Sequence, residues 1–91
     1  MRKIIQTKQF KKDYKKIAAA GRHSIKEFLT VVTLLAEDKP LLEKHRNHVL
    51  SGEWMGYKEC HIKPDWLLIY KKLDNDKSVV LARTGSHSEL F

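Results

Sequence analysis

Apolar residues in the first forty positions recur at the three- and four-residue intervals of a helix. Phe10, Tyr14 and Ile17 share one face of a helix that is expected to begin near Lys8. Thr7 is placed to cap this helix, because a threonine side-chain oxygen accepts a hydrogen bond from a free backbone N–H group. The short β-prone run before it predicts an opening strand.

A second helix is predicted after a short link. Gly21 suits the left-handed end of the first helix, and Ser24 with Glu27 matches a capping box at the start of the second. Pro40 marks the point by which the second helix has ended. Because the link is short, the two helices are expected to form an antiparallel hairpin. The apolar face of the second helix is expected to consist of Phe28, Leu29, Val31, Val32, Leu34 and Leu35.

The stretch from residue 56 to residue 70 changes to the two-residue alternation of β-strands. Residues 63–65 read Lys-Pro-Asp and supply a turn between two strands. The strand before the turn places Tyr57, Glu59 and His61 on one face, which therefore carries titratable groups. The strand after the turn is apolar on both faces, so we expect it at the centre of a sheet.

A last strand is predicted over residues 78–84. Alternation places Arg83 on the same face of this strand as Val79 and Leu81. A guanidinium at the end of an apolar strand needs an anionic partner. The candidates are a carboxylate such as that of Asp65 and a phosphate from a ligand.

The order of these elements predicts an α+β fold, with a helix hairpin packed on one face of a mainly antiparallel sheet. Residues 1–91 are expected to form a single domain, because 91 residues support one modest core. The apolar runs are too short for a membrane span and the first residues lack a signal-peptide core, so the cytoplasm is the expected location. A lone cysteine, Cys60, cannot form an internal disulfide, which agrees with a reducing compartment.

Positive charge is concentrated at the start of the chain. Residues 1–26 hold nine basic residues and one acidic residue, whereas the rest of the chain holds nine basic and ten acidic. Such an asymmetry is typical of a protein that binds a phosphate backbone or an acidic partner. The alternative is a lysine-rich helix face that is simply solvated.

Five histidines suggest acid–base chemistry. His48, His61 and His87 fall at the ends of strands or loops, and with Asp65 and Arg83 they form a set suited to metal-independent RNA cleavage. That reaction needs a base for the ribose 2′-OH proton, an acid for the departing 5′ oxygen and a cation for the phosphorane. A second histidine pair, His45 and His48, has a spacing that could bind a metal. No further ligands accompany this pair at a recognised spacing, so neither a metal nor a cofactor is expected.

Three segments, residues 50–57, 61–70 and 83–91, carry motifs that include His-x-x-Pro-Asp-Trp and Arg-Thr-Gly-x-His with a terminal Phe. These segments resemble the YafQ-type mRNA interferases of the RelE/ParE toxin superfamily. The resemblance implies a RelE-like fold and a bacterial toxin that cleaves mRNA in the ribosomal A site. It also implies a cognate antitoxin, which we expect to be acidic. Val49 is a departure, since relatives can carry proline there.

The resemblance also implies roles for individual residues. His87 is expected to be the general acid, and Asp65, with His61 or His48, the base. Arg83 is expected to hold the scissile phosphate. Two aromatic side chains, Trp66 and Phe91, would stack on or wall the displaced base. The lysines of the first helix, Lys8, Lys11, Lys12, Lys15 and Lys16, would contact the backbone of ribosomal RNA.

The sequence is also compatible with two other functions. A ParE-like toxin would bind a protein target such as DNA gyrase without catalysis, and it would have no reason to keep several titratable groups. A plain nucleic-acid-binding module would use the basic helix to bind RNA without turnover.

Overall fold

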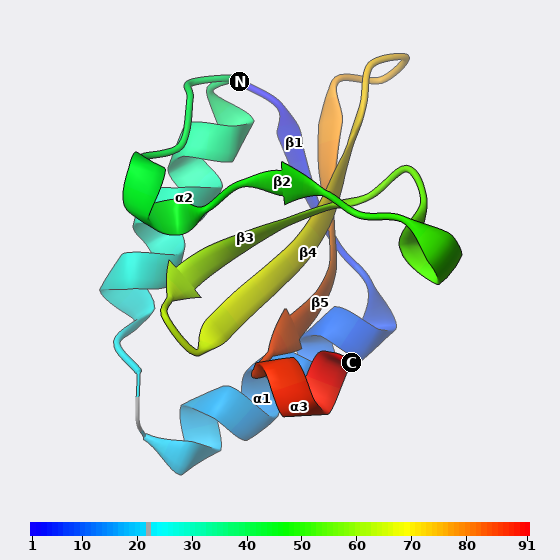
Figure 1. Ribbon diagram of the computed structural model, residues 1–91. Coiled ribbons are helices and arrows are strands. Elements are labelled where there is room, and N and C mark those ends of the chain that lie inside the picture. The colour runs from blue at the N-terminus through cyan, green and yellow to red at the C-terminus, as the bar shows by residue number, and fades with distance from the viewer. Residues whose placement is uncertain (22) are drawn as a thin grey trace.

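The computed structural model describes residues 1–21 and 23–91 (Figure 1). No helix in these two ranges is long and apolar enough to cross a membrane. The elements follow one another as β1 (Lys3–Gln6), α1 (Lys8–Ala20), α2 (Ile25–Ala36), the 3-10 turn η1 (Glu43–His45), β2 (His48–Val49), the 3-10 turn η2 (Gly52–Trp54), β3 (Lys58–Lys63), β4 (Trp66–Leu73), β5 (Ser78–Gly85) and α3 (His87–Leu90).

The strands form one sheet in the order β1-β5-β4-β3-β2, as Figure 1 shows. β1 pairs with β5 in parallel, and every other pair is antiparallel. β4 lies in the middle of the sheet, as its apolar residues on both faces predicted. The α+β class with a mainly antiparallel sheet is therefore confirmed.

The start of α1 follows the prediction. The Thr7 side-chain oxygen accepts a hydrogen bond from the Phe10 N–H at 3.0 Å, and Gly21 ends the helix with φ of 65°. Thr7 also ties the helix to β5, because its hydroxyl donates to the carbonyl oxygen of Ala82 at 2.9 Å. The first turn of α1 is thus fixed to the sheet.

Two details of α2 differ from the prediction. Ser24 caps the helix by accepting from the N–H of Lys26, and the Glu27 carboxylate instead pairs with Lys63 of β3 at 3.5 Å, so the predicted capping box is wrong. Leu29 is 52% exposed and lies outside the packed face. The buried residues of α2 are Val31, Val32, Leu35 and Ala36.

Both faces of the sheet are covered, but unequally. The larger core lies between the sheet and both long helices, and it contains Phe10, Val31, Val32, Leu35, Cys60, Ile62, Trp66, Leu68, Tyr70, Val79 and Leu81. A smaller cluster on the opposite face consists of Leu67, Ile69, Ala82 and Leu90, with Leu50, Trp54 and Tyr57 packed against it. Because α3 covers only part of this second face, polar side chains can line the remainder of it.

A β-bulge in β5 changes the face on which Arg83 lies. Tyr70 of β4 pairs with Leu81, but the next residue, Ile69, pairs with Arg83, which leaves Ala82 as an extra residue in β5. An extra residue moves the side chains that follow it to the other face. Arg83 therefore shares the face of Ile69, and the prediction that it shares a face with Leu81 is wrong.

Candidate active site

The sheet aligns three polar site residues in one row across its strands. His48 of β2 pairs with Glu59 of β3, Glu59 pairs with Ile69 of β4, and Ile69 pairs with Arg83 of β5. Directly paired residues project from the same face of a sheet. Since Ile69 belongs to the smaller cluster, the row lies on the face opposite the two long helices.

Glu59 is the buried centre of a histidine cluster. It is 4% exposed, and its Oε1 lies 3.3 Å from Nε2 of His48 and 3.9 Å from Nε2 of His61. The other ring nitrogen of each histidine faces a backbone carbonyl: Nδ1 of His48 lies 2.8 Å from the oxygen of Arg46, and Nδ1 of His61 lies 3.3 Å from that of Pro64. Because a carbonyl oxygen can only accept, the proton of the neutral ring belongs on Nδ1, and Nε2 is then an acceptor. Nε2 donates to the Glu59 carboxylate only when the ring is protonated.

His87 joins this cluster from α3. Its ring centroid lies 5.5 Å from that of His61, and one ligand atom from each of Glu59, His61 and His87 can be chosen so that all lie within 4.8 Å of one another. Ser86 caps α3 by accepting from the Glu89 N–H, and the Glu89 carboxylate accepts from the Ser86 N–H. A Cβ atom added at Gly85 would lie 3.2 Å from Oε1 of Glu89, so a residue without a side chain lets this cap close.

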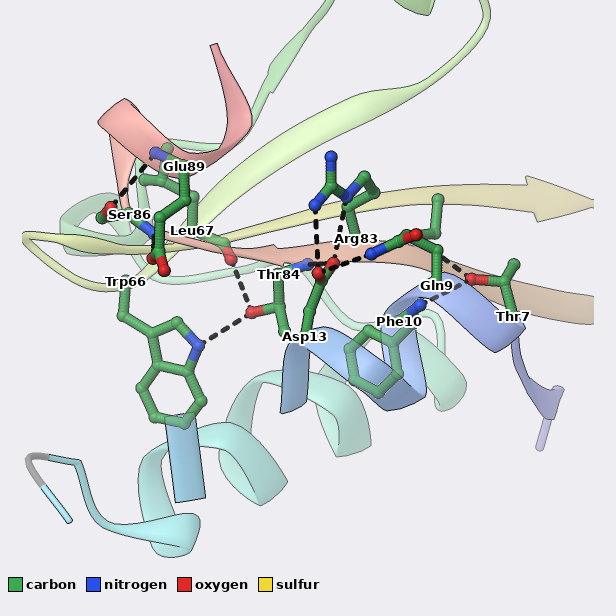
Figure 2. Close-up of polar contacts among 11 residues, drawn as sticks. Thr7, Gln9, Phe10, Asp13, Trp66, Leu67, Arg83, Thr84, Ser86 and Glu89 are labelled. Carbon is green, nitrogen blue, oxygen red and sulfur yellow. Dashed lines mark hydrogen bonds and ion pairs between the residues drawn. The ribbon is translucent and has the colours of Figure 1, made fainter. Parts of the chain in front are cut away.

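Arg83 has a carboxylate partner that the sequence interpretation did not name. Its Nε and Nη2 atoms each lie 3.0 Å from an oxygen of Asp13 in α1, and Figure 2 shows this two-point contact. The proposed partner Asp65 is therefore incorrect. Burial acts to raise the pKa of Asp13, but hydrogen bonds from Arg83, Gln9 and the Thr84 N–H outweigh it and hold the pKa below its usual range. The hydrogen bond to Asp13 raises the pKa of Arg83.

A sequence signal for Asp13 did exist. Asp13 is the one acidic residue among the first 26, and it follows Phe10 by three positions, which places it beside the apolar stripe of α1. A carboxylate at the edge of a buried helix face needs donors from another element. The sequence alone does not say which element supplies them.

Trp66 is not available to stack on a base. Its side chain faces the larger core, it is 1% exposed, and its Nε1 donates to Oγ1 of Thr84 at 2.7 Å (Figure 2). His23 stacks on it at 4.7 Å between ring centroids. A ring this buried offers no face to a stacked base, so Trp66 is a core residue; its predicted alternative role as a wall beside the displaced base stays a prediction, and its side chain lines the same pocket as Asp65.

The other predicted site residues are accessible. Phe91 is 61% exposed at the end of α3, so its aromatic ring is free to meet a ligand. Asp65 is exposed in the turn between β3 and β4 and lines a pocket of about 240 Å³ with Lys16, His23 and Ser86. Within the described residues, no hydrogen bond or ion pair joins Asp65 to the histidine cluster. The predicted RNA-contacting lysines, Lys8, Lys11, Lys12, Lys15 and Lys16, are all exposed on α1.

Comparison with known proteins identifies the family. Residues 2–91 match the family model described as the bacterial toxin of type II toxin–antitoxin systems, YafQ. The chain belongs to the YafQ toxin family. Within that family, the mRNA interferase toxin YafQ of Escherichia coli K12 is 37% identical over 91 residues, which cover 99% of this chain and 96% of the relative.

Solved toxin structures share the whole fold. A metal-bound toxin from Helicobacter pylori superposes with a TM-score of 0.90 at 41% identity, covering all of both chains. YafQ in the E. coli DinJ–YafQ complex gives a TM-score of 0.85 at 37% identity, covering 100% of this chain and 99% of the relative. The RelE-like fold expected from the sequence is therefore confirmed.

The cluster of Glu59, His61 and His87 has the ligand types that suit a transition metal, namely two imidazoles and a carboxylate. No metal was expected at the other histidine pair, His45 and His48. His45 is 2% exposed, and its Nδ1 accepts a hydrogen bond from the Leu42 N–H at 3.2 Å. His45 is thus a structural residue of η1.

Proposed function

We propose that this chain is the toxin of a type II toxin–antitoxin pair and acts as an endoribonuclease, an mRNA interferase that cleaves mRNA on the ribosome without a metal. The observation that carries the proposal is the convergence of His48, His61 and His87 on the buried carboxylate of Glu59. A toxin that only binds a protein target needs no such set of titratable groups. The name of the E. coli relative, an mRNA interferase, supports the same activity.

In the proposed mechanism His61 is the general base. With Nδ1–H donated to the Pro64 carbonyl, the neutral ring presents the lone pair of Nε2. This nitrogen takes the proton of the ribose 2′-OH as the 2′ oxygen attacks the adjacent phosphorus. The negative charge of Glu59 then stabilises the imidazolium that forms, in the way a carboxylate supports histidine in other acid–base sites. His48 has the same orientation toward Glu59 and is the alternative base.

The second half of the reaction needs an acid and a cation. His87 in its protonated form gives a proton to the departing 5′ oxygen as the P–O bond breaks, leaving a 2′,3′-cyclic phosphate on one product and a 5′-OH on the other. Arg83 binds the non-bridging oxygens of the phosphorane. Each acid or base group contributes about 10²- to 10⁴-fold to the rate.

The proposed partners follow from charge and accessibility. Ribosomal RNA contacts the exposed lysines of α1, and mRNA occupies the histidine face of the sheet. An acidic antitoxin covers one of these surfaces, since free activity would harm the host. A protein partner is supported by the DinJ–YafQ complex of the E. coli relative.

The test is primer-extension mapping of a reporter mRNA on programmed ribosomes, with and without EDTA. Wild-type protein is expected to give position-specific cuts that persist in EDTA. His87→Ala is expected to abolish them, whereas Ser88→Ala, a neighbouring change in the same helix, is the control that leaves them in place. Intact mRNA with a wild-type preparation whose expression still arrests growth would contradict the proposal. Growth arrest by His87→Ala would favour the gyrase-binding alternative.

A transition metal offers a separate control on the same site. Zn²⁺ bound by Glu59, His61 and His87 would occupy the nitrogen lone pairs that proton transfer needs. Added Zn²⁺ is therefore expected to slow cleavage, and EDTA to restore it.

A further inference from the structure

Asp13 receives an unusual number of hydrogen bonds for a side chain on a lysine-rich helix. Its two oxygens accept from Nε and Nη2 of Arg83 at 3.0 Å each, from Nε2 of Gln9 at 3.0 Å and from the Thr84 N–H at 3.2 Å. The residue is 7% exposed. Figure 2 shows these donors meeting Asp13 between α1 and β5. A carboxylate with this many donors holds each of them in place.

The position of Asp13 follows from the end of β1. The pairing of β1 with β5 stops at Gln6 and Leu81, so the N–H of Thr84, further along β5, lacks a strand partner on that edge. α1 takes over this edge, and the Thr7 hydroxyl at its start donates to the Ala82 carbonyl oxygen. One oxygen of Asp13 accepts the free N–H of Thr84 and also the Nε–H of Arg83.

We infer that Asp13 is a positioning residue that orients the guanidinium of Arg83 for the scissile phosphate. The inference rests on the proposed function, because it assigns Arg83 to the phosphate. The bulge at Ala82 places Arg83 in the row of Glu59 and His48, and Asp13 then fixes the end of the flexible side chain.

The geometry leaves donors for a ligand. A guanidinium has five N–H groups, and the Asp13 pair uses one on Nε and one on Nη2. Among residues 1–21 and 23–91, the N–H groups of Nη1 and the second one of Nη2 make no hydrogen bond, and the Arg83 side chain is 28% exposed. A fork held on one side by a carboxylate loses little further freedom when its other side binds a phosphate. A lysine at position 83 would keep the charge but lose this two-point alignment.

The main test is a double-mutant cycle in single-turnover cleavage on programmed ribosomes, with Asp13→Asn, Arg83→Ala and the double variant. Asp13→Asn is expected to slow cleavage about 10²-fold, because a small displacement of a catalytic group costs that much. Adding Asp13→Asn to Arg83→Ala is expected to cause no further decrease in the cleavage rate, since Asp13 acts through Arg83. The cleavage rate of Arg83→Lys, with Asp13 intact, is expected to fall as far as that of Asp13→Asn. This variant tests the inference if Asp13→Asn does not fold.

The matched control for a purely structural role is Thr7→Ala. It removes another tie between α1 and β5, from Thr7 to Ala82, together with the N-cap hydrogen bond from the Phe10 N–H, and leaves the Asp13–Arg83 pair intact. Thr7→Ala is expected to cleave within about twofold of wild type when both are compared below their unfolding transitions. Equal decreases in the cleavage rate of Thr7→Ala and Asp13→Asn would overturn the inference. Additive effects of Asp13→Asn and Arg83→Ala on the cleavage rate in the double-mutant cycle would also overturn it.

A second readout is independent of cleavage. In ¹H–¹⁵N spectra of the free protein, the Arg83 Nε–H signal is expected to be protected from exchange and to shift when inorganic phosphate is added. Both features are expected to disappear in Asp13→Asn. If wild-type protein cleaves no mRNA, the proposed function fails, but Asp13-dependent phosphate binding at Arg83 would still support the inference. An Arg83 signal that responds to phosphate equally in both proteins would overturn it.

Discussion

The two aromatic residues expected to contact the displaced base have opposite environments. Trp66 begins an apolar strand and is 1% exposed, whereas Phe91 follows the last helix and is 61% exposed. The motif places them in the same role, but alternation along β4 already points Trp66 to the face of Leu68 and Tyr70. Burial therefore separates a structural aromatic residue from one that can meet RNA.

Replacing Trp66 should affect stability rather than chemistry. Trp66→Phe removes the indole N–H that donates to Oγ1 of Thr84 and leaves part of a buried site unfilled. The free energy of unfolding is expected to fall by about 1–3 kcal/mol, as measured by urea denaturation, with cleavage per folded molecule retained. The opposite result is expected for Phe91→Ala, which should leave the free energy of unfolding unchanged and slow cleavage. A Trp66→Phe protein as stable as wild type but inactive would restore the base-stacking role.

His45 links stability to pH. Burial is the main cause that lowers its pKa, with the charge of Lys44 second, while Glu27 acts in the other direction. Its Nδ1 accepts from the Leu42 N–H, and protonation of this nitrogen would break the bond. Above pH 6.5, the ordinary pKa of histidine, the ring is neutral in both states and its contribution to stability is complete. As the pH falls below 6.5 the unfolded chain binds the proton first, so the folded state loses stability.

The loss from this single group has an upper limit of about 1.4 kcal/mol per pH unit. Urea denaturation at pH 7.5 and pH 5.0 measures it. His45→Asn keeps an acceptor near Leu42 without titrating in this range, so its stability is expected to change less between the two pH values. An equal change in both proteins would assign the pH dependence to other groups.

At the scale of elements, local signals predicted most of the fold. The capping position of Thr7, the left-handed Gly21 and the two apolar faces of β4 each depend on near neighbours, and each was predictable. The β-bulge at Ala82 was not, because it exists only in the pairing of β5 with β4. Strict alternation therefore placed Arg83 on the wrong face and left Asp13 unrecognised. The cluster around Glu59 likewise depends on the pairing of β2, which has only two residues.

The short helix α3 depends on its cap. A four-residue helix is not stable alone, and its N-terminus is held by the reciprocal hydrogen bonds between Ser86 and Glu89. Ser86→Ala is expected to cost about 0.5–2 kcal/mol locally and to slow cleavage by about two- to thirtyfold as His87 loses its position. Global stability is expected to change little. Hydrogen exchange of the α3 amides and cleavage rates measure the two effects. Ser88→Ala removes the hydroxyl contact to Ser86 but keeps both hydrogen bonds between Ser86 and Glu89, and it should show neither effect. Slower cleavage without faster exchange would contradict the explanation.

At the scale of the whole molecule, charge and chemistry occupy different surfaces. α1 packs on one face of the sheet (Figure 1) and carries the exposed lysines. The histidine cluster lies on the opposite face. Asp13 and Arg83 connect the two at the edge of β5. The proposed docking of ribosomal RNA on α1 and the proposed cleavage at the histidine cluster therefore use different surfaces.

The two functions should therefore be separable by mutation. Lys12→Ala combined with Lys15→Ala is expected to weaken association with ribosomes and to lower the slope of log affinity against log salt by about 2, because each phosphate contact contributes about 1. Lys39→Ala combined with Lys44→Ala removes the same charge from exposed positions beyond α2, so it corrects for net charge. Ribosome binding between 50 and 200 mM salt measures the slopes. If both double variants lose the same affinity for ribosomes, net charge alone directs binding. A loss of affinity confined to the α1 double variant identifies this helix as the docking surface. Saturating ribosomes should then restore the cleavage rate of the α1 double variant, since its histidine cluster is intact.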